Sequence, residues 1–163
     1  MLAGRAPAWR SGGRDRGRLP RVSVATVVVR DGKMLFVEEE SARGLVLNQP
    51  AGHLDPGETL LQAAVRETIE ESAWTVRLTH LVGLYQWRAP DGQDFVRVGF
   101  AADPVEHDPA RELDTGIVRA LWLSPAELRA ETPRLRSPLV QALADDWLAG
   151  ARYPLAMART IGI

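Results

Sequence analysis

The chain has 163 residues, of which 45% are hydrophobic and 25% charged, and it contains no cysteine. This length and composition predict one folded domain with a hydrophobic core rather than a disordered chain. The lack of cysteine excludes a disulfide framework and any cysteine-based metal or nucleophile site, and it is compatible with the cytoplasmic location that we expect. The longest apolar-leaning run, residues 22–29, is too short to cross a membrane, and no secretory signal pattern is visible.

The net charge of −1 conceals an asymmetry along the chain. Residues 1–21 carry six arginines and one aspartate, so the remainder has 14 basic and 20 acidic side chains. We interpret residues 1–20, rich in Gly, Arg and Pro, as a disordered basic tail and residues 21–159 as the folded domain. Because that domain is acidic, we expect no nucleic acid as a partner.

Short runs of β-branched and aromatic residues alternate with turn signals and predict a series of strands. Asp31-Gly32 predicts a hairpin, Ala89-Pro90-Asp91-Gly92 predicts a second turn, and residues 103–115 form an acidic loop. We interpret Glu38-Glu39-Glu40 as a charged strand end before a loop at 41–44. The expected strands are residues 21–30, 33–38, 45–52, 75–88 (as one strand or two), 93–102 and 117–123.

Three helix starts follow from capping patterns. Thr59 with Gln62 forms a T-x-x-Q capping box, and Ser124-Pro125 is followed by Glu127 at the third helical position. Ser137-Pro138 begins a further helix that we expect to run to Ala149, with an apolar stripe of Leu139, Leu143, Trp147 and Leu148. Strands and helices arranged around one mixed sheet predict an α/β fold.

The helix after Thr59 carries an unusual cluster of carboxylates. We expect its core-facing side to consist of Leu61, Ala64, Val65, Thr68 and Ser72, with Glu67, Glu70 and Glu71 together on a different face. Like charges at this spacing destabilise a helix, and the helix dipole disfavours anions near the C-terminus. A bound hard cation such as Mg²⁺ or Mn²⁺ would relieve both effects.

The spacing of Gly52, Glu58, Arg66-Glu67 and Glu70-Glu71 resembles the Nudix box, the signature of the Nudix hydrolase family. Two positions differ from the family pattern, because Thr68 stands where a bulky aliphatic residue is usual and Ala73 where glycine is usual. We expect Thr68 still to face the core and Ala73 to need only a backbone conformation that alanine adopts. Neither residue is one of the carboxylates.

The resemblance implies a fold and a set of site residues. It implies an α/β/α sandwich with a mixed central β-sheet, in which Glu67, Glu70, Glu71 and Gly52 hold Mg²⁺, with Mn²⁺ able to substitute. Glu58 and Arg66 would hold the loop and helix in place. The general base stays open between Glu67 or Glu70 and a loop acid, for which Glu112 and Asp114 are the candidates and Glu106 and Asp108 weaker ones.

Substrate contacts are less defined by the sequence. Asn48 and Gln49 suit either a substrate head group or turn support, and Trp87 suits either stacking on a substrate ring or packing in the sheet. Residues 48–54, 86–91, 135–140 and 152–155 resemble a bacterial phosphatase subgroup of the same family. That subgroup releases orthophosphate from nucleoside di- and triphosphates and from thiamine-type pyrophosphates, including hydroxymethylpyrimidine pyrophosphate.

Two other functions stay open at this stage. One is a nucleotide-pool pyrophosphohydrolase acting on dNTPs or ADP-ribose, since Pro90, sixteen residues past Trp74, resembles a marker of the ADP-ribose group. The other is a non-catalytic Nudix domain that binds a nucleotide. In each case the expected partner is a small-molecule diphosphate, and the protein would be a monomer or a homodimer. No P-loop motif and no zinc-ligand spacing of histidines is present.

Overall fold

The computed structural model describes residues 19–162, so the predicted tail at residues 1–20 lies outside the described residues except for its last two. Residues 19–162 form seven strands, three α-helices and two short 3₁₀ turns. The strands are β1 (Arg21–Arg30), β2 (Lys33–Ser41), β3 (Gly44–Asn48), β4 (Ala51–His53), β5 (Trp74–Arg88), β6 (Asp94–His107) and β7 (Ile117–Leu123). The helices are α1 (Leu60–Ser72), α2 (Pro125–Ala130) and α3 (Pro138–Leu148), with η1 (Thr132–Arg134) and η2 (Leu155–Met157) as the 3₁₀ turns.

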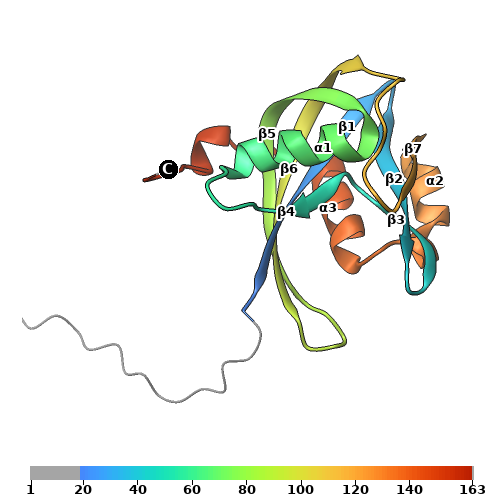
Figure 1. Ribbon diagram of the computed structural model, residues 1–163, viewed down its shortest axis with the longest axis horizontal. Coiled ribbons are helices and arrows are strands. Elements are labelled where there is room, and N and C mark those ends of the chain that lie inside the picture. The colour runs from blue at the N-terminus through green and yellow to red at the C-terminus, as the bar shows by residue number, and fades with distance from the viewer. Residues whose placement is uncertain (1–18, 163) are drawn as a thin grey trace, which may run out of the picture.

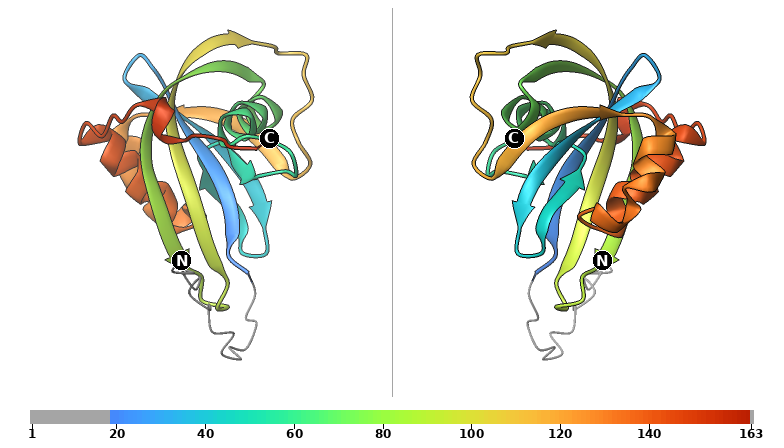
Figure 2. Two further views of the ribbon diagram at one scale, coloured as in Figure 1. Left: turned by 90° about the vertical axis from the view of Figure 1, so that its left-hand side faces the viewer. Right: turned by 90° about the vertical axis from the view of Figure 1, so that its right-hand side faces the viewer.

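The strands form one mixed sheet in the order β3-β2-β1-β6-β5, with β7 beside β2 and β4 beside β1. Strands β1 and β6 are parallel, and the other neighbours are antiparallel. Helix α1 covers one side of this sheet and α3 the other, as the two side views in Figure 2 show. The predicted α/β sandwich with a mixed central sheet is therefore confirmed.

The sheet divides next to β1, and this division creates the place for the site. Strands β1 and β2 pair only beside their hairpin, through Val29↔Met34 and Arg30↔Lys33. Further along, β1 pairs instead with the short strand β4, which places Gly52 opposite Val24. Strand β4 thus lies in the gap between β1 and β2, below α1 in Figure 1.

Side chains of β1 alternate between the two faces of the sheet, as the strand period of two requires. Val24 packs against Ala63 and Ala64 of α1, whereas Ala25 and Val27 belong to the core beneath α3 that includes Leu143. All six side chains are at most 1% exposed. Because both cores share β1, the helix that carries the carboxylates is fixed to the same strand as β4.

Helix α1 begins and ends largely as its sequence predicts. Thr59 and Gln62 form the expected reciprocal capping box. Thr68 is fully buried and shares a 2.7 Å hydrogen bond with the hydroxyl of Thr26, which confirms that it faces the core. Ala73 caps the helix at φ 59°, so alanine does adopt the conformation that this position needs, in the left-handed region that it occupies only at a cost.

The structure differs from the sequence prediction at several points, and the strand predicted at 45–52 is two separate strands, β3 and β4. Strand β2 continues to Ser41, and Glu38 is only 4% exposed, with Arg119 of β7 and Arg134 of η1 both paired with it. Strand β6 extends to His107, well into the predicted loop at 103–115. Leu148 is exposed and so does not join the apolar stripe of α3. Cross-strand partners such as those of Glu38 are invisible in a local sequence window.

Within residues 19–162 no helix has both the length and the apolar character needed to cross a bilayer.

We expect Ala73→Gly to stabilise the protein by about 1 kcal/mol, because glycine adopts positive φ without the clash that a Cβ creates. The free energy of unfolding from urea titrations measures this gain. Ala149→Gly is the matched control. Ala149 caps α3 at φ −72°, so glycine at this position relieves no strain and should not stabilise the protein. An Ala73→Gly variant no more stable than the parent would show that the backbone of Ala73 is not strained.

Candidate active site

The carboxylates of α1 do not all lie where the helical periodicity places them. The buried face of α1 consists of Ala63, Ala64, Glu67, Thr68, Glu71 and Ser72. Glu67 and Glu71 therefore lie in the middle of the buried face, while Leu61 and Val65 lie at its edges. The predicted separation of the carboxylates from the buried face is wrong for these two residues. Two buried acids beside β4 need compensation that an apolar core does not provide.

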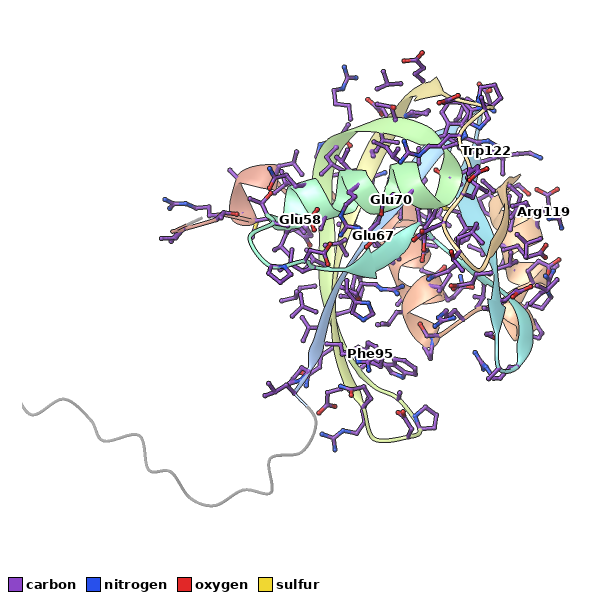
Figure 3. The ribbon with its side chains drawn as sticks, in the orientation of Figure 1. Glu58, Glu67, Glu70, Phe95, Arg119 and Trp122 are labelled. Atoms are coloured by element: carbon purple, nitrogen blue, oxygen red, sulfur yellow. The ribbon has the colours of Figure 1, made fainter. Side chains whose placement is uncertain are left out.

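Arg66 supplies part of that compensation, through a network of charged hydrogen bonds. Its Nε and Nη2 atoms donate to the two carboxylate oxygens of Glu58, at 2.8 and 2.9 Å. Its Nη1 atom donates to Glu67 at 2.9 Å and to Glu70 at 3.0 Å, and Nη2 also donates to the carbonyl oxygen of His53. One guanidinium thus joins the loop before α1, the helix itself and β4. Figure 3 labels Glu58 just before α1 and Glu67 and Glu70 along it.

Gly52 is required by the position of Glu67. A Cβ atom built on Gly52 would lie 2.0 Å from the Cδ and Oε1 atoms of the Glu67 side chain. No other residue type therefore fits in this strand while the carboxylate keeps its place. The main chain of β4 and the carboxylate of Glu67 meet in direct contact, which brings backbone oxygen and carboxylate oxygen into one corner of the molecule.

Glu71 lies deepest of the three helix carboxylates. Its Oε2 atom accepts a 2.8 Å hydrogen bond from the backbone N–H of Ala51. Burial, opposed by the hydrogen bond from Ala51 and assisted by the nearby carboxylates of Glu39, Glu67 and Asp114, raises the pKa of Glu71 to about 8. Burial likewise raises the pKa of Glu67, against the effect of Arg66. These acids hold negative charge only at a cost unless a cation joins them.

The donor set in this corner suits a hard divalent cation. Three carboxylates and the backbone of Gly52 offer oxygen atoms, which Mg²⁺ and Mn²⁺ prefer. Among residues 19–162 no three acidic or histidine side chains converge closely enough to coordinate one ion as they stand. The reason is visible in the contacts, because Arg66 lies between Glu67 and Glu70 and the amide of Ala51 binds Glu71.

A cleft of about 1570 Å³ opens beside this corner. Strand β4 forms one wall of the cleft, and the β5–β6 hairpin, the β2–β3 hairpin and the first turns of α3 form the others. The predicted substrate-contact residues Asn48 and Trp87 both line it. Trp87 stacks on Phe95 with ring centroids 5.6 Å apart, and Figure 3 shows Phe95 where the hairpin leaves the sheet. The cleft therefore places an aromatic surface near the carboxylate corner.

The other predicted residues separate into two groups. Gln49 is 1% exposed and donates a 2.7 Å hydrogen bond to the carbonyl of Val140, so it joins β4 to α3 and leaves no surface for a substrate. Asp114 lies beside α1, because its backbone N–H donates to the carbonyl of Glu70 at 2.9 Å. Glu112 is exposed on the same loop. The structure thus favours Asp114 over Glu112 as the loop acid nearest the cluster.

Sequence reasoning missed Arg97, which lines the cleft from β6 and is 8% exposed. Its surroundings come from three strands that are distant in the chain, so no local motif marks it. The one available signal is an arginine within a run of strand residues, Phe95-Val96-Arg97-Val98, where a buried position is expected.

Comparison with known proteins now identifies the family. The NUDIX domain model matches residues 19–143. The chain belongs to the Nudix family. It is 41% identical to the Phosphatase NudJ of Escherichia coli K12 and to that of Shigella flexneri over 138 residues, covering 85% of this chain and 90% of each relative. A NUDIX hydrolase from Nitrosomonas europaea is 43% identical, with a TM-score of 0.85, 88% of this chain covered and 98% of that one.

These findings confirm the predicted Nudix fold and a Nudix-type phosphohydrolase. The geometry brings Glu58, Arg66, Glu67, Glu70, Glu71 and Gly52 into one contiguous cluster.

The pKa of Glu71 predicts how the metal-free protein responds to pH. Its folded pKa near 8 exceeds the ordinary value of 4.5, so the carboxyl favours the folded state when protonated and this contribution is lost as the pH rises through 8. We expect the free energy of unfolding, measured in EDTA, to fall by a few kcal/mol between about pH 5 and about pH 9.

Glu71→Gln is the control for this prediction, because its amide keeps the size of the side chain and cannot ionise. The variant should show a distinctly flatter pH dependence over the same range. Identical pH profiles for the two proteins would show that Glu71 does not carry the effect.

Proposed function

We propose that the protein is a Mg²⁺-dependent phosphohydrolase that releases orthophosphate from nucleoside di- and triphosphates and from thiamine-type pyrophosphates, including hydroxymethylpyrimidine pyrophosphate. The observation that carries this proposal is the carboxylate corner formed by Glu67, Glu70, Glu71 and Gly52. Likeness over most of the chain to proteins named Phosphatase NudJ supports the orthophosphate product. The cytoplasm is the proposed location, with Mn²⁺ able to replace Mg²⁺.

The corner has the chemistry that such a reaction needs. In this proposal Glu67, Glu70, Glu71 and the Gly52 carbonyl hold the cation, and Arg66 and Glu58 keep the helix and loop in register. When bound, Mg²⁺ offsets the charge of the phosphates and lowers the pKa of an attacking water. Glu67 or Glu70 accepts the proton of that water, or Asp114 does so from its loop.

In this proposal the substrate enters from the cleft. Within residues 19–162, this cavity is lined both by β4 and by the aromatic residues of the β5–β6 hairpin. Trp87 and Phe95 offer a flat apolar surface for a nucleobase or a thiamine-type ring. Asn48 is 4% exposed and lines the same cleft. A small-molecule diphosphate would therefore place its ring on the hairpin and its phosphates toward β4.

We expect Glu70→Gln to reduce kcat about 10²–10⁴-fold while leaving the fold intact, because Glu70 is a part-exposed acid on the helix surface. A Mg²⁺-containing panel of CDP, CTP, thiamine pyrophosphate, dGTP and ADP-ribose, scored separately for orthophosphate, pyrophosphate and AMP, gives the measurement. Circular dichroism confirms the fold of the variant.

The same panel separates the alternatives. Orthophosphate from thiamine pyrophosphate and CDP is the expected result. Pyrophosphate from dGTP or AMP from ADP-ribose as the main product would replace the proposal with a pyrophosphohydrolase. A protein that binds Mn²⁺ and turns over no member of the panel would be a binding domain.

Gly52→Ala tests the corner without removing a ligand side chain. The added Cβ must displace the Glu67 carboxylate, so we expect Mn²⁺ affinity to fall at least tenfold by isothermal titration calorimetry, with a stability loss of about 1–3 kcal/mol. Gly99→Ala is the matched control, because its Cβ would meet Leu143 at 2.3 Å on the α3 side. It should lose similar stability and keep its Mn²⁺ affinity; equal losses of affinity would show a general packing effect.

A further inference from the structure

Arg97 is a buried cation without a matching anion. None of the ion pairs formed within residues 19–162 includes it, although its side chain is almost closed off from solvent. Its Nη1 atom makes one long hydrogen bond, 3.3 Å to the amide oxygen of Asn48, and its Nε atom has no partner. A guanidinium carries five N–H donors, so most of its hydrogen-bonding capacity is unused.

Such a group destabilises the fold. Burial lowers the pKa of Arg97 to about 10, with Glu39 and Glu71 acting against that shift from a distance. Glu39, which lines the same cleft, already pairs through one oxygen with Arg136 at 3.4 Å. A hydrophobic residue would fill the position at less cost. The packing of the protein therefore does not explain why an arginine occupies position 97.

Its place in the sheet suggests the reason. Arg97 lies opposite Ser23 of β1, and Ser23 lies opposite His53 of β4, so the backbone of Arg97 is about 10 Å from the strand that carries Gly52. In the other direction Phe95 is two residues away on the same face of β6, roughly 7 Å along the strand. Arg97 thus lines the cleft between β4, which carries Gly52, and the aromatic surface of the hairpin.

The cleft around Arg97 is also lined by other polar atoms that have no hydrogen-bond partner. Six buried side-chain atoms among residues 19–162 lack a hydrogen-bond partner, and five of them belong to residues that line this one cleft. They are Ser23 Oγ, Glu39 Oε1, Arg97 Nε, Ser137 Oγ and Gln141 Oε1. Buried polar atoms are normally satisfied, so their concentration here indicates a site that a polar ligand completes.

We propose that Arg97 binds the phosphate group that stays attached to the organic part of the substrate, between the phosphate at the carboxylate corner and the ring on Trp87 and Phe95. This inference rests on the proposed function and extends it to a residue outside the Nudix box. The planar guanidinium fork matches two phosphate oxygens, and a doubly charged phosphate supplies the anion that the protein lacks at this point. When the substrate is a diphosphate, the monophosphate product keeps the same contact.

The test compares AMP with adenosine, which differ only in the phosphate. Dissociation constants are measured by NMR titration of the full-length protein in millimolar Mg²⁺, which requires no turnover. We expect Arg97→Gln to weaken AMP binding about 10–100-fold, the range for hydrogen bonds to charged groups, and to change adenosine binding less than about threefold. Arg97→Lys should recover part of the AMP affinity, since it restores the charge without the fork.

Arg88→Gln is the matched control. Arg88 lines the same cleft and the change removes the same charge, but both carboxylate oxygens of Asp94 already bind its guanidinium. We expect this variant to keep its AMP affinity within about threefold. An equal effect of Arg88→Gln and Arg97→Gln would overturn the specific contact in favour of general electrostatics.

The fold provides a second readout. Because Arg97 is an unpaired buried cation, Arg97→Gln should unfold at the same temperature as the parent or higher. An unfolded or strongly destabilised variant would mean that Arg97 has a structural role and would contradict the proposal. Equal weakening of AMP and adenosine would also contradict it, because the contact would then be to the ring or sugar.

These outcomes are separable from those of the proposed function. If AMP binding depends on Arg97 while no diphosphate is hydrolysed, the phosphate contact stands and the hydrolase assignment fails. If diphosphates are hydrolysed and Arg97→Gln binds AMP as the parent does, only the inference about Arg97 fails.

Discussion

The structure of the site depends on the guanidinium of Arg66. This one group contacts Glu58 before the helix, Glu67 and Glu70 on the helix, and the carbonyl oxygen of His53 in β4. Without Arg66, the negative charges of Glu58, Glu67 and Glu70 would lie close together with no positive charge to compensate them. Arg66 therefore joins a loop, a helix and a strand at the carboxylate corner, in addition to the core packing and the Ala51–Glu71 hydrogen bond that hold α1 beside β4.

The contacts of Arg66 also explain how the site can respond to a cation. Glu67 and Glu70 share a single nitrogen of Arg66, and Glu71 binds the main chain of Ala51 instead. The carboxylates are thus held close to one another by hydrogen bonds, with raised pKa values at Glu67 and Glu71 where burial is greatest. A divalent cation would replace protons and part of the arginine contact, so binding is expected to release protons.

The clustering of these residues follows from the sequence because its determinants are local. The capping box of Thr59 and Gln62, the spacing of the glutamates and the hairpin at Asp31-Gly32 all act within a few residues, and each is present in the structure. Helical periodicity fails for Glu67 and Glu71, because it assigns carboxylates to the exposed face. Gly52 decides the outcome, since the missing side chain leaves room for a carboxylate on the buried face.

Features that depend on distant segments are not predictable in this way. Arg97, Ser23 and His53 lie side by side only because β1 pairs with β6 on one side and with β4 on the other. Gln49 is similar: its polar side chain beside a turn suggests a substrate contact, but α3 folds over it and accepts its hydrogen bond. The cleft is assembled from four such segments, so the sequence indicates the chemistry of the corner better than the shape of the substrate.

The central claim is that Glu67, Glu70, Glu71 and Gly52 together hold a divalent cation. A crystal of the protein grown with Mn²⁺ tests it directly, because the anomalous scattering of manganese locates the ion without reference to any assumed site. The account predicts a peak between α1 and β4, about 2.0–2.6 Å from carboxylate oxygens of these residues. A peak elsewhere in the molecule, or none at this corner at saturating Mn²⁺, would contradict it.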